Sequence, residues 1–258
     1  MNLMIEQRTH FKIITSGYKC SKWIVDCLQS VHNQKYDNWQ MIVHIDHSPD
    51  NTYAAASEYI ECVKDSRIML IGNSERRLCP KNDLEAIALS KAKQEDVLVF
   101  LDADDWLYDA YVFQYLNTVY SKQDIWVTWG SYINSHNGER GKASTPFSEE
   151  HKDQRIWRYS HLKTFKYFLF KGVQDEDLRD KDSGEYYTPA WDMSFMFPIV
   201  EMAGKEHSKF ISKILYVYNT ENSISNEKVD LQKCLRFANE ITKERPMYSQ
   251  QTREELCR

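Results

Sequence analysis

Long hydrophobic runs are missing from this chain of 258 residues. No window approaches the roughly 20 apolar residues that a membrane-spanning helix needs. The first residues, MNLMIEQRTHFKIITSG, carry Glu6, Arg8 and His10 where a secretory signal peptide would need an unbroken apolar core. We therefore expect a cytoplasmic protein with no transmembrane segment.

Paired cysteines and clustered basic residues are also missing. The six cysteines include no C-x-x-C pair, so their spacing indicates neither a zinc site nor a disulfide framework. The formal net charge is −5 and no block of Lys and Arg occurs, which leaves no broad basic surface for a nucleic-acid backbone. We expect small-molecule partners and no nucleic acid.

Apolar residues are plentiful, and β-rich runs alternate with segments of helical periodicity. The chain is 42% hydrophobic, which is typical of a packed globular protein. Four β-rich runs, each followed by a segment of helical periodicity, cover residues 11–15, 39–46, 67–71 and 97–101. The helix after the third run is expected to begin at Asn82, because Glu85 gives a capping-box spacing. Strands that alternate with helices predict an α/β fold with a mainly parallel sheet.

The order of elements is less regular after residue 105. The sequence predicts a helix at residues 110–120 and a strand at 125–133. The polar stretch 134–154 is interpreted as a loop. A final apolar strand, KILYVYN at residues 213–219, precedes a charged helical tail.

Three carboxylates directly follow the fourth apolar run in VLVFLDADDW, residues 97–106. Asp102, Asp104 and Asp105 repel one another unless a cation or hydrogen-bond donors compensate their charge. A structural interpretation is that they end the strand and cap the next helix. A calcium loop of the EF-hand type is excluded, because Trp106 and Leu107 occupy positions that need an oxygen ligand and a glycine.

Two chemical interpretations of these carboxylates remain. A phosphatase-type aspartyl nucleophile can lie in a D-x-D pair at a strand end, but that pair normally occurs near the start of the chain. A D-x-D metal clamp would hold Mg²⁺ or Mn²⁺ through hard oxygens, and the ion would bridge two phosphates of a nucleotide. The clamp explains the crowding, because the ion offsets the repulsion. Ligands of such sheets bind at the carboxyl edge, where Thr15, Asp46 and Asp102 are expected.

Several motifs together resemble a family 2 glycosyltransferase of the GT-A fold, over residues 11–219. FKIITSGYKCSKWIVDCLQSVHNQKYDNWQMIVHIDHSPDNT resembles the family's opening, and FLDADDWL resembles its D-x-D strand. The resemblance implies one Rossmann-like domain, residues 1–220, and a C-terminal helical tail, 221–258. Residues 1–133 would bind the nucleotide sugar, and residues 134–220 would hold the acceptor and the catalytic residue.

The resemblance also implies roles on the donor side. Thr15 would lie by the base or ribose, and Asp46 would accept from a uracil-type imide. Asp46 takes the second place of the family's adjacent aspartate pair, and Ile45 replaces the first. Asp102 and Ala103 would approach the ribose.

For the ion and the diphosphate, the resemblance gives further roles. Asp102 and Asp104 would ligate the Mn²⁺ or Mg²⁺. The loop NSERRLCPKND lacks the family's Gly-rich approach to an Arg-Asn pair. Lys81, followed by Asn82, would replace that pair and screen the diphosphate, and the alternative is a solvated basic loop.

For the second half, the resemblance implies that Asp192 in Ala190-Trp191-Asp192 is the catalytic base. The alternative is that Asp192 caps the helix that follows, while Trp191 could stack on a sugar. His161 and His207 are each either a further metal ligand or structural.

The reaction implied by the resemblance is a metal-dependent, inverting transfer of a sugar from a nucleotide diphosphate, UDP-linked, to a hydroxyl of a glycan or other acceptor. One alternative is a catalytically silent module that binds nucleotide sugars. A nucleotidyltransferase is a second alternative, and TSGYKCS disfavours it because that class usually has a Gly-rich loop after the first strand. The donor sugar and the acceptor are left open.

Overall fold

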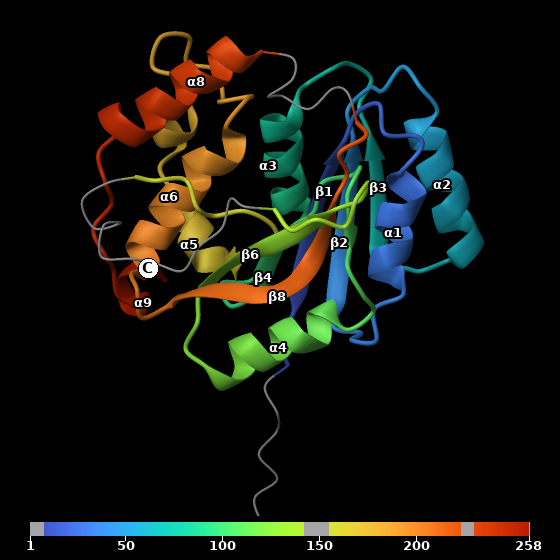
Figure 1. The fold of residues 1–258 in the computed structure, drawn as a ribbon, viewed down its shortest axis with the longest axis horizontal. Coiled ribbons are helices and arrows are strands. Elements are labelled where there is room, and N and C mark those ends of the chain that lie inside the picture. Colours follow the sequence, from blue (N-terminus) through green and yellow to red (C-terminus); the bar gives the residue numbers. More distant parts are fainter. Residues whose placement is uncertain (1–7, 142–154, 223–229, 258) are drawn as a thin grey trace, which may run out of the picture.

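The computed structural model describes residues 8–141, 155–222 and 230–257. In these residues an eight-stranded sheet lies between two layers of helices (Figure 1). The N-terminal elements are β1 (Phe11–Gly17), α1 (Ile24–His32), β2 (Trp39–Ile45), α2 (Thr52–Val63), β3 (Ile68–Gly72), α3 (Cys79–Ser90) and β4 (Val97–Phe100). The later elements are β5 (Trp106–Leu107), α4 (Val112–Lys122), β6 (Val127–Asn134), β7 (Lys163–Lys166), α5 (Tyr167–Gly172), η2 (Asp175–Leu178), α6 (Trp191–Ala203), β8 (Ser208–Tyr218), α8 (Leu231–Asn239), η3 (Glu240–Glu244) and α9 (Arg253–Leu256).

The strand order is β3-β2-β1-β4-β7-β6-β8-β5. The first four strands are parallel, as βαβ crossovers require. β7 lies antiparallel between β4 and β6, and β5 pairs antiparallel with the end of β8. The α/β class and the mainly parallel arrangement of the first half are therefore confirmed.

Each face of the sheet is covered by its own hydrophobic core. Residues of α1, α2 and α4 pack on one face, and residues of α3, α5 and α6 pack on the other. Along β1, Phe11 and Ile13 belong to the first core and Ile14 to the second. Burial on both faces explains why these strands are almost continuously apolar.

Most predicted elements correspond to observed ones, with shifted bounds. The runs at residues 11–15, 39–46, 67–71 and 97–101 become β1 to β4. The predicted start of α3 at Asn82 is wrong, because the helix begins at Cys79 and has Pro80 in its first turn. β5 and β7 were not predicted. Of the polar stretch, residues 142–154 lie outside the described residues.

The C-terminal tail is helical and packs against the second core. Phe237, Ile241 and Leu256 are buried in the core that also contains α5 and α6. The buried Arg155 donates two hydrogen bonds to Glu201 of α6, at 2.6 and 2.8 Å, and one to the carbonyl of Ile241 at 2.7 Å. The tail is thus packed onto the same domain.

Among the described residues, no helix is both long enough and apolar enough to cross a bilayer. All six cysteines are free thiols.

Candidate active site

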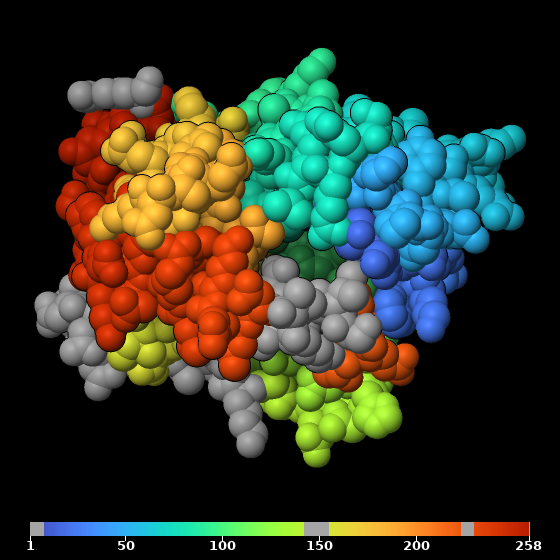
Figure 2. Space-filling model, turned by 90° about the horizontal axis from the view of Figure 1, so that it is seen from above, coloured from blue at the N-terminus to red at the C-terminus, as the bar shows by residue number. Residues whose placement is uncertain are grey.

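The carboxyl ends of β1, β2 and β4 meet at one edge of the sheet. The segment after β4 remains beside β1, because Leu101 N–H donates to the Ile14 carbonyl at 3.1 Å. The segment after β2 also remains beside β1, because Asp46 N–H donates to the Gly17 carbonyl at 2.8 Å. Figure 2 shows this face hollowed between the blue-to-cyan first half and the orange-to-red second half.

Gly17 is required by the close approach of two segments at this edge. A Cβ at this position would lie 2.9 Å from the Cβ of Ala103, which is closer than real side chains pack. The side chain of Ala103 is itself buried in the first core. Ala103 can therefore offer a ligand only its backbone.

Asp46 is buried, and both of its carboxylate oxygens bind the loop after β3. Oδ1 accepts hydrogen bonds from Arg77 N–H at 2.7 Å and from the Asn73 amide at 3.1 Å. Oδ2 accepts from Leu78 N–H at 2.9 Å. Burial acts to raise the pKa of Asp46, but these hydrogen bonds outweigh it and hold the pKa below its usual value. Asp46 therefore fixes residues 73–78 against β2.

Leu78 has a backbone conformation that belongs almost exclusively to glycine. Its φ is 70° and its ψ is 158°, which costs about 1–3 kcal/mol for other residues. The loop NSERRLC contains no glycine. Because Asp46 binds the N–H of Leu78, the loop retains this conformation although it lacks the Gly-rich sequence of the family that it resembles.

We expect Asp46→Asn to lower the free energy of unfolding at pH 7 by about 1–3 kcal/mol, because one backbone N–H would then face an amide donor. The folded-state pKa of Asp46 is lowered. Its contribution is therefore complete above the ordinary carboxyl pKa of about 3.9 and is lost as the pH falls through the folded-state value. Urea unfolding of the parent and of Asp46→Asn at a series of pH values measures this contribution. A difference in unfolding free energy that stays the same in acid would contradict the prediction.

Asp105 has a structural role within the carboxylate cluster. It is buried, accepts from the Tyr216 hydroxyl at 2.5 Å and accepts from Asn219 N–H at 2.7 Å. Burial and the neighbouring Asp104 and Asp102 raise its pKa well above the usual value. Asp105 therefore joins the end of β8 to the segment that follows β4.

Asp102 and Asp104 are the more accessible carboxylates of the cluster. Asp102 is exposed, and Asp104 is half-buried with its Oδ2 accepting from the Asn222 amide at 2.7 Å. Although the residue is exposed overall, the protein atoms packed around its carboxylate raise the pKa of Asp102 above its usual value, and Lys163 opposes the shift. These are hard oxygen donors of the kind that Mg²⁺ and Mn²⁺ prefer.

Asp192 lies in the first turn of α6 with its side chain 37% exposed. Its Oδ2 accepts from Lys163 Nζ at 2.9 Å, and its Oδ1 accepts from Met193 N–H at 3.0 Å. The N-cap of α6 is Ala190, with no side-chain cap. The alternative interpretation of Asp192 as the helix cap is therefore wrong.

A buried carboxylate that the sequence reasoning missed joins α3 to α6. Asp83 accepts hydrogen bonds from the Ser16 hydroxyl and from Trp191 Nε1, the latter at 2.8 Å. Burial raises the pKa of Asp83 above its usual value. Trp191 is itself buried, so its indole does not offer a face to a sugar. The N-terminus of α6 is thus fixed to the first half of the chain.

The remaining predicted donor-side residues lie at different depths. Thr15 and Asn82 are fully buried, and Thr15 Oγ1 and Asn82 Nδ2 have no hydrogen-bond partner within the described part of the chain. Buried polar atoms without partners are rare and often mark a ligand or water position. Lys81 lies at the surface in an ion pair with Glu185 of the second half, at 3.1 Å.

The two candidate histidines lie in different places. His161 is half-buried and stacks on Tyr216, the partner of Asp105, with ring centroids 4.5 Å apart. Burial and then Lys163 lower its pKa well below the usual value.

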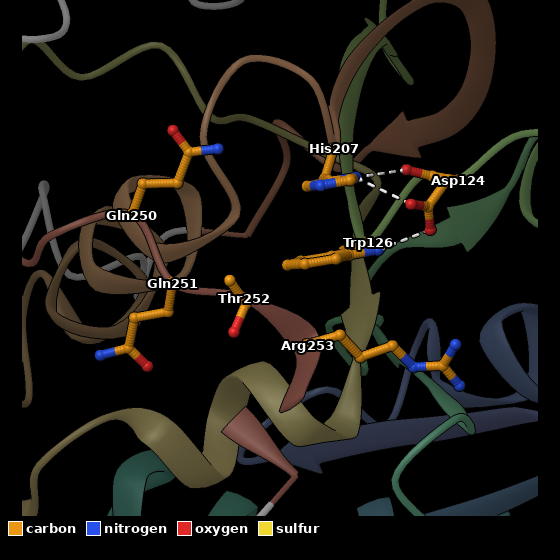
Figure 3. A pocket seen from close by; sticks show the side chains of 7 residues that line it. All are labelled: Asp124, Trp126, His207, Gln250, Gln251, Thr252 and Arg253. Atoms are coloured by element: carbon orange, nitrogen blue, oxygen red, sulfur yellow. Dashed lines mark hydrogen bonds and ion pairs between the residues drawn. The ribbon is translucent and has the colours of Figure 1, made fainter. Parts of the chain in front are cut away.

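His207 directly precedes β8, whereas Tyr216 lies near the far end of that strand. At 3.3 Å per residue, the two residues are about 30 Å apart. It stacks on Trp126 with centroids 3.7 Å apart, beside a cavity of about 460 Å³ (Figure 3). The cavity is lined by Asp124, Trp126, His207, Gln250, Gln251, Thr252 and Arg253. His207 is therefore not a ligand of an ion at Asp104.

The candidate site thus lies at the carboxyl edge of a mainly parallel sheet, where ligands of α/β proteins commonly bind. The family model "Glycosyl transferase family 2" matches residues 12–177. The chain belongs to this family. The EpsH protein of Bacillus subtilis (strain 168) is 27% identical over 113 residues, which cover 44% of this chain and 31% of EpsH.

Solved structures share the fold at low sequence identity. S. aureus TarS 1-349, in complex with UDP-GlcNAc, has a TM-score of 0.65 and 15% identity, and the match covers 90% of this chain and 65% of TarS 1-349. A mannosyltransferase of Pyrobaculum calidifontis, in complex with GDP-Man and Mn²⁺, has a TM-score of 0.54 and 16% identity, covering 82% and 57%. The fold is therefore of the GT-A type. The chain spans less than two thirds of the length of each of these proteins.

Proposed function

We propose that the chain is a metal-dependent, inverting glycosyltransferase that moves a sugar from a UDP-sugar to a hydroxyl acceptor. The observation that carries the proposal is Asp192, a partly exposed carboxylate held by Lys163 beside the edge that bears Asp102 and Asp104. A nucleotide diphosphate donor is supported by the UDP-GlcNAc in TarS and the GDP-Man in the archaeal enzyme.

Asp102 and Asp104 would hold the ion, Mn²⁺ or Mg²⁺. Among the described residues, no group of three or more His, Cys, Asp or Glu side chains is arranged to enclose a metal by itself. Such ions are commonly held by one or two carboxylates, with substrate phosphates and water completing the shell. When bound, the ion would offset charge on the departing diphosphate.

The other donor contacts follow from the placement of the edge residues. The base and ribose would lie near Thr15, Asp46 and the backbone of Ala103. Lys81 would lie at the rim, near the diphosphate. Asp46 would act largely through the loop that it fixes, since both of its oxygens already accept from residues 73–78.

Asp192 would act as the general base. Its carboxylate would take the proton of the acceptor hydroxyl while that oxygen attacks the anomeric carbon. A single in-line attack inverts the configuration at that carbon. Asp83 and Trp191 would keep the start of α6, and with it Asp192, at a fixed place relative to the donor.

The test is a titration of UDP with and without Mn²⁺, followed by turnover of UDP-GlcNAc as the first donor. Mn²⁺-dependent binding with release of UDP supports the proposal. Binding without any turnover of a panel of nucleotide sugars would instead indicate a silent binding module.

A further inference from the structure

Lys163 is an ammonium group buried beside the carboxylates of the candidate site. The residue is only 4% exposed. Its Nζ donates to Asp192 Oδ2 at 2.9 Å and lies 3.5 Å from His161 Nδ1. Asp192, Asp102 and Asp105 all attract its charge. A lysine at this depth is rare unless it is paired.

The fold explains why a lysine comes to this position. β7 is inserted antiparallel beside β4, and Lys163 pairs in register with Phe100, two residues before Asp102. The first turn of α6 lies against the same edge and supplies Asp192. The ion pair thus joins the strand next to the D-x-D segment to the helix that carries the proposed base.

We propose that Lys163 is a positioning residue for Asp192, holding its carboxylate in one orientation toward the acceptor. The inference rests on the proposed function of Asp192. The ammonium group of Lys163 would thus act on the reaction through Asp192. It is distinct from the metal ion expected at Asp102 and Asp104.

The difference in exposure between the two partners supports this division. The Lys163 side chain is 5% exposed and that of Asp192 is 37% exposed. An acceptor hydroxyl can therefore reach the carboxylate, whereas the ammonium lies behind it. A lysine that bound the donor phosphates directly would need to be more accessible.

Lys166 provides a matched control on the same strand. It is also nearly buried, at 9% exposure, and its Nζ pairs with Glu95 at 3.0 Å. Lys163→Met and Lys166→Met therefore remove equivalent buried ammonium groups, only one of which faces the carboxylate edge.

The first measurement is turnover of UDP-GlcNAc in Mn²⁺, with UDP affinity determined in parallel. We expect Lys163→Met to lower kcat about 100-fold, the typical cost of a displaced catalytic group, with UDP affinity within about threefold of the parent. Lys166→Met should keep the parental kcat. In an Asp192→Asn background, Lys163→Met should lower turnover no further. Equal kcat values for the two Met variants, or loss of UDP binding in Lys163→Met alone, would overturn the inference.

The second measurement is urea unfolding, which does not depend on activity. Asp192→Asn leaves Lys163 without its main partner, so the urea midpoint should fall. Adding Lys163→Met removes the unpaired charge, so the double variant should recover part of the lost midpoint. Lys163→Gln, which retains a hydrogen-bond donor, replaces the Met variant if that protein does not fold.

The two measurements separate the inference from the proposed function. A parent that turns over no nucleotide sugar, with recovery of the midpoint in the double variant, would reject the proposed function while supporting the Lys163–Asp192 pair. No recovery in the double variant would overturn the inference whatever the activity.

Discussion

Asp192→Asn should reduce turnover of a UDP-sugar by about 10² to 10⁴, the usual contribution of a general base. Asparagine preserves the shape of the side chain but cannot take a proton. The affinity for UDP should stay close to the parental value, because the donor is expected to bind to the first half of the chain. Steady-state kinetics and calorimetric titration of UDP measure the two quantities separately.

Asp175→Asn is a suitable control for this variant. Asp175 also begins a helical segment and pairs with a basic side chain, Arg179, at 2.6 Å. It lies outside the proposed site, so its variant should keep full turnover.

Proton NMR of the early product formed by the parent enzyme should show the anomeric configuration opposite to that of the donor. Retention of configuration, or near-parental turnover in Asp192→Asn, would remove Asp192 from the mechanism.

Asp104→Ala should abolish the enhancement of UDP binding by Mn²⁺ and leave the fold intact. The expected loss is large because one of two proposed carboxylate ligands is removed. The fold should tolerate the change, since removing one of three neighbouring carboxylates relieves repulsion. Titration of UDP with and without Mn²⁺ measures the enhancement, and circular dichroism checks the fold.

Asp109→Ala is the control for the metal experiment. Asp109 follows the same cluster in sequence but lies 4.0 Å from Lys213, in a surface ion pair. Its variant should keep the Mn²⁺ effect. An unchanged Mn²⁺ effect in Asp104→Ala would reject the clamp.

The first half of the fold could be predicted because its signals are local. β1, β2 and β4 are apolar runs that are largely buried, and β1, β2 and β3 are each followed directly by a helix. β7 escaped prediction because KTFK has lysines at both ends, and only tertiary contacts with Asp192 and Glu95 make their burial possible. β5 is only two residues long.

The candidate site was predictable in part for the same reason. Asp102 and Asp104 follow a buried strand and can be recognised locally. Lys163 and Asp83 cannot, because their partners Asp192 and Trp191 are distant in sequence. A lysine inside the apolar run HLKTFKYFLF and a carboxylate inside a helical pattern were the available signals. The structural role of Asp105 likewise depends on β8.

The pairing of distant strands has a consequence for the order in which the protein folds. Phe100 pairs with Lys163, and Leu107 pairs with Tyr216, so the second half of the sheet requires closure of long loops. Contacts of this kind form later than the short βαβ contacts of β1 to β4. Tyr216 and Asn219, the partners of Asp105, belong to the last strand and the residues after it. In a nascent chain, Asp105 therefore has neither of these two partners until β8 and Asn219 have been synthesised and docked.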